Sequence, residues 1–355
     1  MSFRLLIKSL PATLLFGYAL IANVTVFQEG GWDLGDAGLM GGEATSMLDR
    51  LYAEDLPHRD PSINLIGASR YLLLKEGRAG VVVGQRNWLF SDEEFRFAES
   101  APVSLPDSVV GIARVSEQLA QRGIELVLLP LPAKVDIERS HIGDAAIPER
   151  SAQEYTEFFD ALSDAGLHVL DTRPSFGTPD APRFFKTDTH WTTETTLSVA
   201  MSLAGSGLIA KGDTEFRKVP QTPEVFTGDL VSFVTGDGMA AKVGLPPEVV
   251  ESFVAEKETG GALDLFAASE TFDVVLIGTS YSADARWSFE EALKLFLGHD
   301  VLNLSEKGRG PVAPMLDFLG TGLAALESPP QVVIWEFPVR YLADPALWPE
   351  GSRDA

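Results

Sequence analysis

The sequence predicts an α/β fold in which helices cover both faces of a mostly parallel sheet. Short, uninterrupted apolar runs alternate along the chain with segments whose apolar residues recur at helical spacing. Such runs are typical of strands buried on both faces, and their alternation with helices is typical of parallel sheets. Ligands of these sheets bind beyond the carboxyl ends of the strands. A further observation, an acid and a histidine two residues apart, indicates the kind of site to expect there.

The predicted elements follow the chain in order. Val81 to Phe90 contains two β-rich runs around Gly84 to Asn87, which predicts a hairpin. The expected strands of the main sheet are Glu125 to Leu131, His168 to Asp171, Asp273 to Ile277, Asp300 to Leu304 and Gln331 to Phe337. The expected helices are Ser108 to Arg122, Ala152 to Ala165, Thr192 to Leu208, Ala285 to Leu297 and Pro314 to Leu326.

Residues 1–28 are predicted to form one transmembrane helix that acts as a signal anchor. No charged residue lies between Lys8 and Glu29, and this apolar stretch approaches the roughly 20 residues that span a bilayer. Basic residues precede it and acidic residues follow it, so the positive-inside tendency predicts export of the remaining chain. The alternative is a cleaved signal peptide, for which Leu20-Ile-Ala22 is a poor cleavage pattern.

The remaining chain is predicted to contain a linker and one domain. Residues 29–75 are rich in Gly, Asp and Glu and are expected to be a linker with a helix leading into the domain. Residues 76–345 carry the strand and helix alternation. Within them, residues 211–271 interrupt the alternation with many Gly, Pro, Thr and acidic residues. We expect this stretch to be an insertion of mixed structure that overhangs the site.

The composition excludes several kinds of function. The chain has 28 Lys and Arg residues against 51 Asp and Glu residues, a formal net charge of −23. This argues against a nucleic-acid partner, because binding phosphates needs a basic surface. The absence of cysteine excludes disulfides, thiolate nucleophiles and cysteine zinc sites.

Asp188, His190 and Ser280 supply the residue types of a nucleophilic triad. Residues i and i+2 of an extended chain point to the same side, so Asp188 can stand beside the His190 imidazole. Ser280 follows a predicted buried strand and the short exit Gly278-Thr279, and we expect a helix to begin near Ala283. A serine becomes a nucleophile when an oriented base removes its proton. The alternatives are an ordinary capping serine and a packed, hydrogen-bonded histidine.

No cofactor or metal is predicted. The sequence has no His-x-x-x-His, no cysteine and no acidic calcium loop. Gly308-Arg309-Gly310 is too short to be a phosphate-binding loop. Its backbone amides or Arg309 are candidates for holding an oxyanion, and the alternative is a plain turn before a helix.

Six segments together resemble the alginate O-acetyltransferases of the AlgJ and AlgX type, whose catalytic domain is similar to the SGNH hydrolases. The resemblance covers roughly residues 76–341. It rests on Gly84-Gln-Arg-Asn-Trp88-Leu-Phe90, Pro130-Leu-Pro-Ala-Lys134, Thr187-Asp188-Thr-His190-Trp191, Gly228-Asp-Leu230, Gly278-Thr-Ser280-Tyr-Ser282 and Trp335-Glu-Phe-Pro-Val-Arg-Tyr341. Asn87 stands where the family usually has Gly, which is compatible because Asn also accepts positive φ.

The resemblance implies an SGNH-hydrolase-like three-layer α/β/α fold and an exopolysaccharide O-acetyltransferase. Ser280 would be the nucleophile that forms an acetyl-serine, His190 the general base and Asp188 its orienting acid. The order, with the acid and histidine ahead of the serine, matches the permuted arrangement of this family. The chain ends soon after Tyr341. We therefore expect the carbohydrate-binding module of the AlgX type to be missing and the N-terminal anchor to be retained, which makes the AlgJ type the closer match.

The resemblance also implies partners, a location and further site residues. The acceptor would be a polysaccharide, the acetyl donor a membrane-bound O-acyltransferase, and other polysaccharide-secretion proteins would assemble with it. The catalytic domain would lie in the periplasm, anchored to the bacterial inner membrane. The residues expected to contact substrate or the oxyanion are Trp191, Tyr281, Lys134, Gly308, Arg309 and Gly310. Trp191 and the insertion would also exclude water, the competing acceptor.

Three matters stay open at the level of sequence. An esterase or deacetylase would use the same trio with water as the acceptor. A scaffold that binds polysaccharide without catalysis belongs to a different class of function. The polymer also stays open: a polyanion such as alginate requires a local basic groove, to which Lys134, Lys186 and Arg309 would contribute, whereas a neutral polymer such as cellulose does not.

Overall fold

The computed structural model describes residues 3–29, 45, 59–97, 104–177, 182–258 and 272–348. The chain forms two compact units, Met1–Leu74 and Lys75–Ala355. The first contains α1 (Phe3–Glu29) and α3 (Arg59–Leu74), and most of the predicted linker lies outside the described residues. Within the part of the chain that the structure describes, no helix is long and apolar enough to cross a membrane. A helix does cover residues 1–28 from Phe3 onward, but the membrane span is not shown and stays a prediction.

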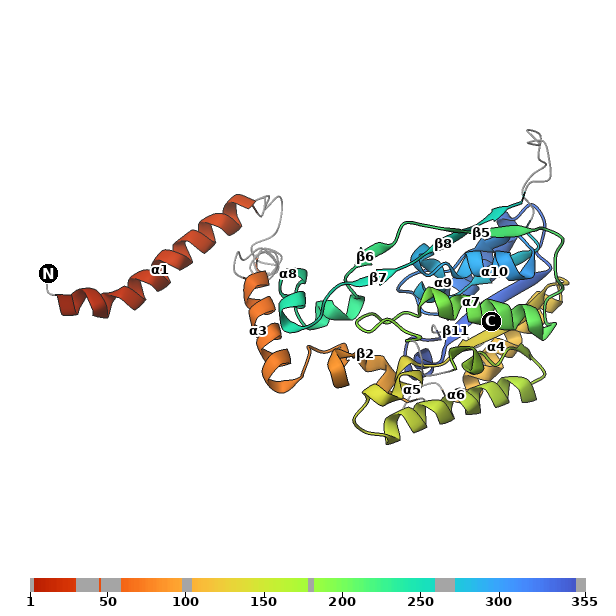
Figure 1. The fold of residues 1–355 in the computed structure, drawn as a ribbon, viewed down its shortest axis with the longest axis horizontal. Helices are drawn as coiled ribbons and strands as arrows, with labels where there is room; N and C mark the ends of the chain where they lie inside the picture. Colours follow the sequence, from red (N-terminus) through yellow and green to blue (C-terminus); the bar gives the residue numbers. More distant parts are fainter. Residues whose placement is uncertain are drawn as a thin grey trace. The chain divides into compact units, whose positions relative to one another are not determined.

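The second unit is built on a five-stranded parallel sheet, as predicted (Figure 1). The strand order is β10-β9-β11-β3-β4, and each neighbouring pair is parallel. The strands are β3 (Glu125–Leu131), β4 (His168–Val169), β9 (Val274–Ile277), β10 (Val301–Asn303) and β11 (Val332–Pro338). All five coincide with predicted strands, although β4 is shorter than predicted.

Helices cover both faces of this sheet and make three layers. On one face, Val127, Leu129 and Leu131 of β3 join a buried cluster with residues of α7 (Thr193–Ser206) and α10 (Phe289–Leu297). On the other face, Leu126 and Leu128 join a cluster with residues of α4 (Leu105–Ala120), α6 (Ala146–Asp164) and α11 (Val312–Asp317). Because successive side chains of a strand alternate between faces, one apolar run supplies both cores.

Two predicted helices are broken in the structure. The stretch predicted as Ala285 to Leu297 is a 3₁₀ turn, η8 (Ala285–Trp287), followed by α10, with Ser288 between them at φ 52°. The stretch predicted as Pro314 to Leu326 divides into α11, a π-turn (Phe318–Gly322) and α12 (Leu323–Ala325). The π-turn contains two glycines, which weaken a regular helix.

Short elements surround the carboxyl edge of the sheet. The predicted hairpin is confirmed as β1 (Val81–Val83) and β2 (Leu89–Ser91), joined by a turn in which Asn87 has φ 64°. The others are η2 (Asp92–Phe95), α5 (Lys134–Ile137), η4 (Arg139–His141), η5 (Arg173–Phe176), α9 (Ser280–Ala283) and η10 (Val339–Ala343).

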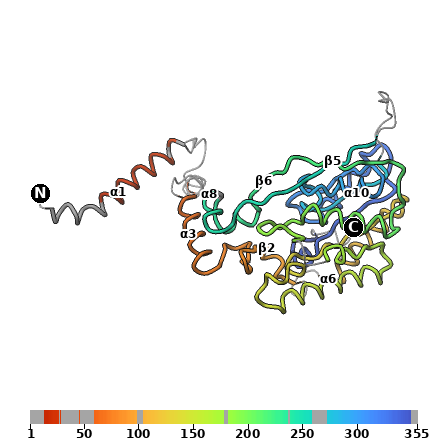
Figure 2. The backbone as a smooth tube through the Cα atoms, viewed as in Figure 1, coloured from red at the N-terminus to blue at the C-terminus, as the bar shows by residue number. Residues whose placement is uncertain are grey.

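The described part of the predicted insertion has mixed structure. Strands β5 (Phe216–Pro220) and β8 (Phe253–Lys257) pair antiparallel beside α10, and β6 (Glu224–Phe226) pairs antiparallel with β7 (Glu248–Val250) (Figure 2). Between β6 and β7 lie η6 (Asp229–Phe233), α8 (Asp237–Ala240) and η7 (Ala241–Val243). Contacts between η6 and β2 bring the insertion to the carboxyl edge of the sheet.

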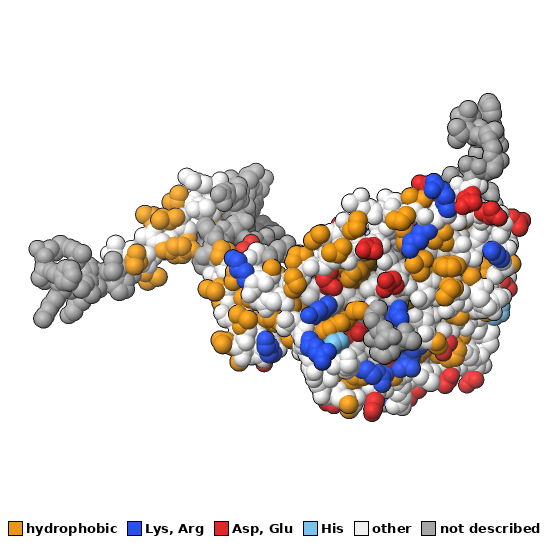
Figure 3. Space-filling view, in the orientation of Figure 1, with side chains coloured by type: hydrophobic (Ala, Val, Ile, Leu, Met, Phe, Trp, Pro, Cys, Tyr) orange, Lys and Arg blue, Asp and Glu red, His pale blue; other side chains and the backbone are white. Residues whose placement is uncertain are grey.

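The surface mixes both signs of charge in spite of the net charge of −23. On the face shown in Figure 3, acidic and basic side chains are interspersed with apolar ones. Lys and Arg side chains gather in the lower middle of the large unit in that view. The overall acidity therefore does not describe every part of the surface.

Glu94 predicts a pH dependence of folding. Its side chain is 2% exposed and accepts a hydrogen bond from the Val135 N–H. Burial raises its pKa to about 7, so between pH 4.5 and 7 the unfolded chain loses this proton before the folded one and stability falls as pH rises. The Glu94 carboxyl group should lower the free energy of unfolding by about 3 kcal/mol between pH 4.5 and 7. Glu94→Gln should abolish this contribution, as measured by urea unfolding at both ends of this pH range. An unchanged pH dependence in the variant would contradict the assignment.

Candidate active site

The nucleophile candidate, Ser280, lies directly beyond the carboxyl end of the buried strand β9. It is the first residue of α9, so the helix begins three residues earlier than predicted. Thr279 is the N-cap, and its hydroxyl accepts a hydrogen bond from the Tyr281 N–H. Ser280 is partly exposed, whereas its neighbours Thr279 and Tyr281 are buried. The turn therefore presents the serine side chain and hides those beside it.

Asp188 and His190 lie in a loop that precedes α7. The loop is closed at its base by a β-bridge between Phe184 and Trp191 and by a hydrogen bond from the Phe185 N–H to the His190 carbonyl. Phe184 and Trp191 are fully buried in the core beneath α7. Packing of these aromatic side chains fixes the base of the loop and with it the position of His190.

The structure brings Asp188, His190 and Ser280 together in one hydrogen-bonded line. His190 Nδ1 lies 2.6 Å from Asp188 Oδ1, and His190 Nε2 lies 2.8 Å from Ser280 Oγ. With the Nδ1 proton donated to Asp188, Nε2 is free to accept the serine proton. The predicted meeting of two segments ninety residues apart is therefore confirmed as geometry.

Aromatic side chains enclose the imidazole. Trp287 stacks on His190 with ring centroids 5.0 Å apart and an interplanar angle of 23°, and the Tyr281 ring lies 5.0 Å away at 56°. His190 is 8% exposed and Trp287 is fully buried. The imidazole therefore lies in apolar surroundings, and its polar contacts are at the two ring nitrogens: Nδ1 faces Asp188 and Nε2 faces Ser280. The sequence analysis did not find Trp287, because nothing in its spacing links it to His190.

Asp188 is buried and remains the charged partner. Burial by itself would raise the pKa of Asp188. The hydrogen bond and charge of His190 outweigh it, with help from the backbone N–H groups of Asp229 and His190, and lower the pKa. A carboxylate with these partners orients the imidazole and stabilises its protonated form.

Asp229 is a second acid beside the histidine, which the sequence analysis did not single out. Its Oδ2 lies 3.9 Å from His190 Nδ1, and its carboxylate accepts hydrogen bonds from the Thr189 N–H and hydroxyl. Its own N–H donates to Asp188 Oδ2. The Asp229 side chain is 44% exposed, and its partial burial and the charge of Asp188 raise its pKa. The insertion thus ties Asp188 and Thr189 in place.

Glu248 provides a second tie from the insertion. Its carboxylate accepts hydrogen bonds from the backbone N–H groups of Lys186 and Thr187 and from the Thr187 hydroxyl. Gly228 lies against the Thr187 carbonyl, where a Cβ would clash. The insertion was expected to overhang the site. The structure shows in addition that it binds the segment that carries Asp188.

Lys134, predicted to contact substrate, lies in the interior instead. Its side chain is fully buried, and its Nζ donates to the carbonyls of Leu89, Lys186 and Asp188 at 2.6, 3.2 and 2.9 Å. All three ammonium protons are used, so none remains for a substrate. Burial lowers the pKa of Lys134. Lys134 joins β2 to the segment of the catalytic acid.

Trp191 and Tyr281 are also interior residues rather than substrate contacts. Trp191 is fully buried and its indole N–H donates to the Tyr281 carbonyl at 3.0 Å. Tyr281 is 3% exposed and its hydroxyl donates to the Thr189 carbonyl at 2.9 Å. Together they fasten the loop of His190 to the turn of Ser280. The predicted contact with substrate does not fit this burial, which sequence spacing does not reveal.

The predicted oxyanion loop is a turn between β10 and α11. Gly308 and Gly310 have φ of 75° and 65°, which explains the two glycines. The exposed Arg309 guanidinium pairs with Glu306 and Asp317. The guanidinium that was predicted to contact an oxyanion or a polyanion is therefore already engaged in these ion pairs. The Trp335 indole N–H fixes the end of the loop by donating to the Pro311 carbonyl at 2.8 Å.

One group of possible metal ligands occurs among the described residues. Asp188, His190 and Asp229 each offer one atom within 4.8 Å of the others. Their atoms already serve one another and Thr189 as hydrogen-bond partners. Binding an ion here would break the hydrogen bond between His190 Nδ1 and Asp188 Oδ1, which orients the imidazole.

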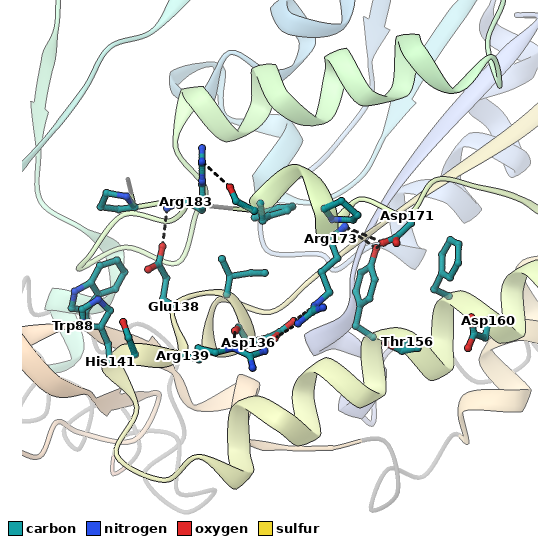
Figure 4. A pocket seen from close by; sticks show the side chains of 18 residues that line it. Trp88, Asp136, Glu138, Arg139, His141, Thr156, Asp160, Asp171, Arg173 and Arg183 are labelled. Carbon is teal, nitrogen blue, oxygen red and sulfur yellow. Dashed lines mark hydrogen bonds and ion pairs between the residues drawn. The ribbon is translucent and has the colours of Figure 1, made fainter. Parts of the chain in front are cut away.

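A cavity of about 710 Å³ lies away from the triad. It is lined from α5, α6 and the turn after β4, and none of the three triad residues lines it (Figure 4). Its charged side chains largely satisfy one another: Asp136 pairs with Arg139 and Arg173, and Asp171 accepts a hydrogen bond from Tyr155. Within the described residues, this cavity and the Asp188, His190 and Ser280 group are therefore separate sites.

Comparisons with known proteins show the family to which the chain belongs. The family described as "SGNH hydrolase-like domain, acetyltransferase AlgX" matches residues 81–339. The chain belongs to this family. A probable alginate O-acetylase AlgJ of Azotobacter vinelandii is 36% identical over 315 residues, which cover 86% of this chain and 80% of the relative. The corresponding protein of Pseudomonas aeruginosa is 31% identical over 94% of this chain and 91% of its own length.

Solved structures show the same SGNH-hydrolase-like fold. The O-acetyltransferase domain of Pseudomonas putida AlgJ superposes with a TM-score of 0.64 at 31% identity, covering 75% of this chain and 93% of that domain. Pseudomonas aeruginosa AlgX superposes with a TM-score of 0.58 at 23% identity, covering 75% of this chain and 67% of AlgX. The predicted family and fold class are therefore confirmed.

Lys134 provides a test of how the site is held. Lys134→Met keeps the apolar stem but leaves three carbonyls without their donor, so we expect a loss of about 3 kcal/mol in the free energy of unfolding. Urea unfolding measures this loss. Arg309→Met is the matched control and should leave stability unchanged, because its ion pairs are exposed. Equal stability of both variants and the wild type would show that Lys134 does not hold the segment.

Proposed function

We propose that this protein is an O-acetyltransferase that acetylates hydroxyl groups of an exported polysaccharide through an acetyl-serine at Ser280. The single observation that carries the proposal is the position of His190, between Asp188 at 2.6 Å and Ser280 at 2.8 Å. Membership of the acetyltransferase family and the relatives named alginate O-acetylase support the choice of reaction and of acceptor.

The first half-reaction loads the enzyme. His190 Nε2 takes the proton of Ser280 as its Oγ attacks the carbonyl carbon of an acetyl donor. The bond to the donor's leaving group then breaks, and His190 returns the proton to that group. Asp188 stabilises the imidazolium in between. The product is an acetyl ester on Ser280.

The second half-reaction transfers the acetyl group. An acceptor hydroxyl gives its proton to His190 and attacks the ester carbon, and Ser280 Oγ leaves and takes the proton back. In both halves the Ser280 N–H, at the start of α9, is the donor we assign to the oxyanion. Trp287 and Tyr281 enclose the base with apolar surface, which limits the access of water as a competing acceptor.

Ser280→Ala tests the nucleophile. It should abolish acetylation of the polymer, measured as ester content of the secreted polysaccharide in cells that carry the variant as their only copy. The variant should still fold, because Ser280 is partly exposed and its side chain makes a hydrogen bond to His190 and not to the core. Intact acetylation with Ser280→Ala would instead favour the non-catalytic scaffold.

Asp188→Asn tests the orienting acid. The amide keeps the shape of the carboxylate but favours the wrong histidine tautomer, so kcat should fall by roughly 1,000-fold or more on an acetyl ester. Asp229→Asn is the matched control with a much smaller loss, because Asp229 lies 3.9 Å rather than 2.6 Å from His190 Nδ1. Equal losses in the two variants would mean that the acids act as a pair.

A hydrolase would use the same three residues with water as acceptor. The purified enzyme, offered an acetyl ester and an excess of oligosaccharide, separates the two reactions. Transfer predicts acetylated oligosaccharide at the expense of free acetate. Release of acetate alone, at every acceptor concentration, would favour the esterase.

The polymer, the partners and the location follow from the same proposal. The relatives named alginate O-acetylase favour alginate, and the gathering of Lys and Arg side chains on one face reduces the objection from net charge. The donor would be a membrane-bound O-acyltransferase, within a set of polysaccharide-secretion proteins. The basic residues at the start of α1 and the acidic residues that follow its apolar stretch support a periplasmic domain anchored to the inner membrane.

A further inference from the structure

Glu336 is an acidic residue in β11, the central strand of the sheet. All seven residues of β11 are buried, and Glu336 is fully so. It belongs to the segment Trp335 to Tyr341, to which neither the triad nor the acetyl transfer gives a role. Burial of a carboxyl group is costly unless specific partners receive it, and it often marks a functional group.

The partners of Glu336 are the residues on either side of the nucleophile. Its Oε2 accepts hydrogen bonds from the Thr279 N–H at 2.7 Å and from the Ser282 hydroxyl at 3.0 Å. The Thr279 hydroxyl lies 3.1 Å from both carboxylate oxygens. Since this hydroxyl also accepts from the Tyr281 N–H, three residues around Ser280, namely Thr279, Tyr281 and Ser282, depend on one carboxylate.

The sheet register and Gly278 make this contact possible. Trp335 pairs with Ile277 in the parallel ladder, which places Glu336 beside Gly278. A Cβ at position 278 would clash with the Glu336 carboxylate. The glycine before the nucleophile therefore leaves room for the acid behind it, and the carboxylate reaches the turn from the central strand rather than from solvent.

We propose that Glu336 is a positioning residue that holds the nucleophile turn so that Ser280 Oγ faces His190. The proposal rests on the proposed role of Ser280. Glu336 does not touch the reacting atoms. It fixes the backbone before Ser280 and the side chain after it, and it leaves the Ser280 N–H and Oγ unengaged by the carboxylate.

The ionised form of Glu336 fits this task better than the protonated form. Every partner that the turn offers is a donor, so a carboxylate accepts all of them, whereas a carboxylic acid adds a competing proton. Burial raises the pKa of Glu336 to about 7, opposed by the bonds from Thr279 and Ser282 and by the charge of Arg340. Arg340 follows β11, and its guanidinium lies 5.3 Å from the centre of the Tyr281 ring.

The test measures the reactivity of Ser280 with a serine-directed sulfonyl fluoride, which needs neither acetyl donor nor polysaccharide. The full-length protein with Glu336→Gln should label roughly tenfold or more slowly than the wild type, as expected for a displaced nucleophile. On the acid side of neutrality, protonation of Glu336 should contribute to a fall in the wild-type rate. The variant should lack this contribution, and its melting temperature shows whether the fold is kept.

Glu94→Gln is the matched control, because Glu94 is an equally buried acid with its pKa raised to about 7. Its bond is to Val135 and not to the nucleophile turn, so the labelling rate should stay within about twofold of the wild type. If Glu336→Gln fails to fold, Ser282→Ala removes one donor to Glu336 and should still slow labelling.

The outcomes separate this inference from the function on which it rests. Wild-type protein that does not label at Ser280 would refute the nucleophile itself. Labelling of the wild type together with equal rates and pH profiles in folded Glu336→Gln would overturn the positioning role alone. Equal slowing by Glu94→Gln would show a general effect of buried charge and would also overturn it.

Discussion

The structure depends on one side chain, His190, having two partners of opposite kind at once. A carboxylate at Nδ1 and a hydroxyl at Nε2 give the imidazole a fixed tautomer and a direction for proton transfer. Because Trp287 and Tyr281 fill the space around the ring, the imidazole keeps this orientation without further polar contacts. The rest of the fold must bring a loop before α7 and a turn after β9 within hydrogen-bond distance of each other.

Charged side chains perform that task from three directions. Lys134 holds the Asp188 segment from the interior, and Asp229 and Glu248 hold it from the insertion. Glu336 reaches the Ser280 turn from the central strand. Lys134 and Glu336 are fully buried, and burial of a charged group is costly by itself. The carboxyl edge of the sheet is therefore less stable than an apolar core would be. In return, these contacts fix the positions of the Asp188 segment and the Ser280 turn.

Apolar runs located all five strands of the main sheet, since burial on both faces leaves a continuous signal. The Asp-x-His pair and the strand-end serine indicated three side chains that the structure brings together, but the residues alone also allowed a capping serine and a packed histidine, and the catalytic roles came from the family resemblance. The sequence was insufficient for what surrounds them. Lys134, Trp191 and Tyr281 were assigned to substrate because residue type does not reveal which way a side chain points. Asp229, Glu248 and Glu336 act through contacts 40 to 61 residues away or across strands, which local spacing cannot show. The helix predicted from Ala285 to Leu297 is broken at Ser288, whose left-handed backbone interrupts an otherwise regular apolar pattern.

The central claim is that Ser280 carries the acetyl group between donor and polysaccharide. Mass spectrometry of the protein after brief exposure to an activated acetyl ester, quenched in acid, tests it most directly. The account predicts one acetyl group on the peptide that contains Ser280, lost when a polysaccharide acceptor is added and transferred to that acceptor. Acetylated polysaccharide formed with no acetyl group on Ser280 at any time would contradict it.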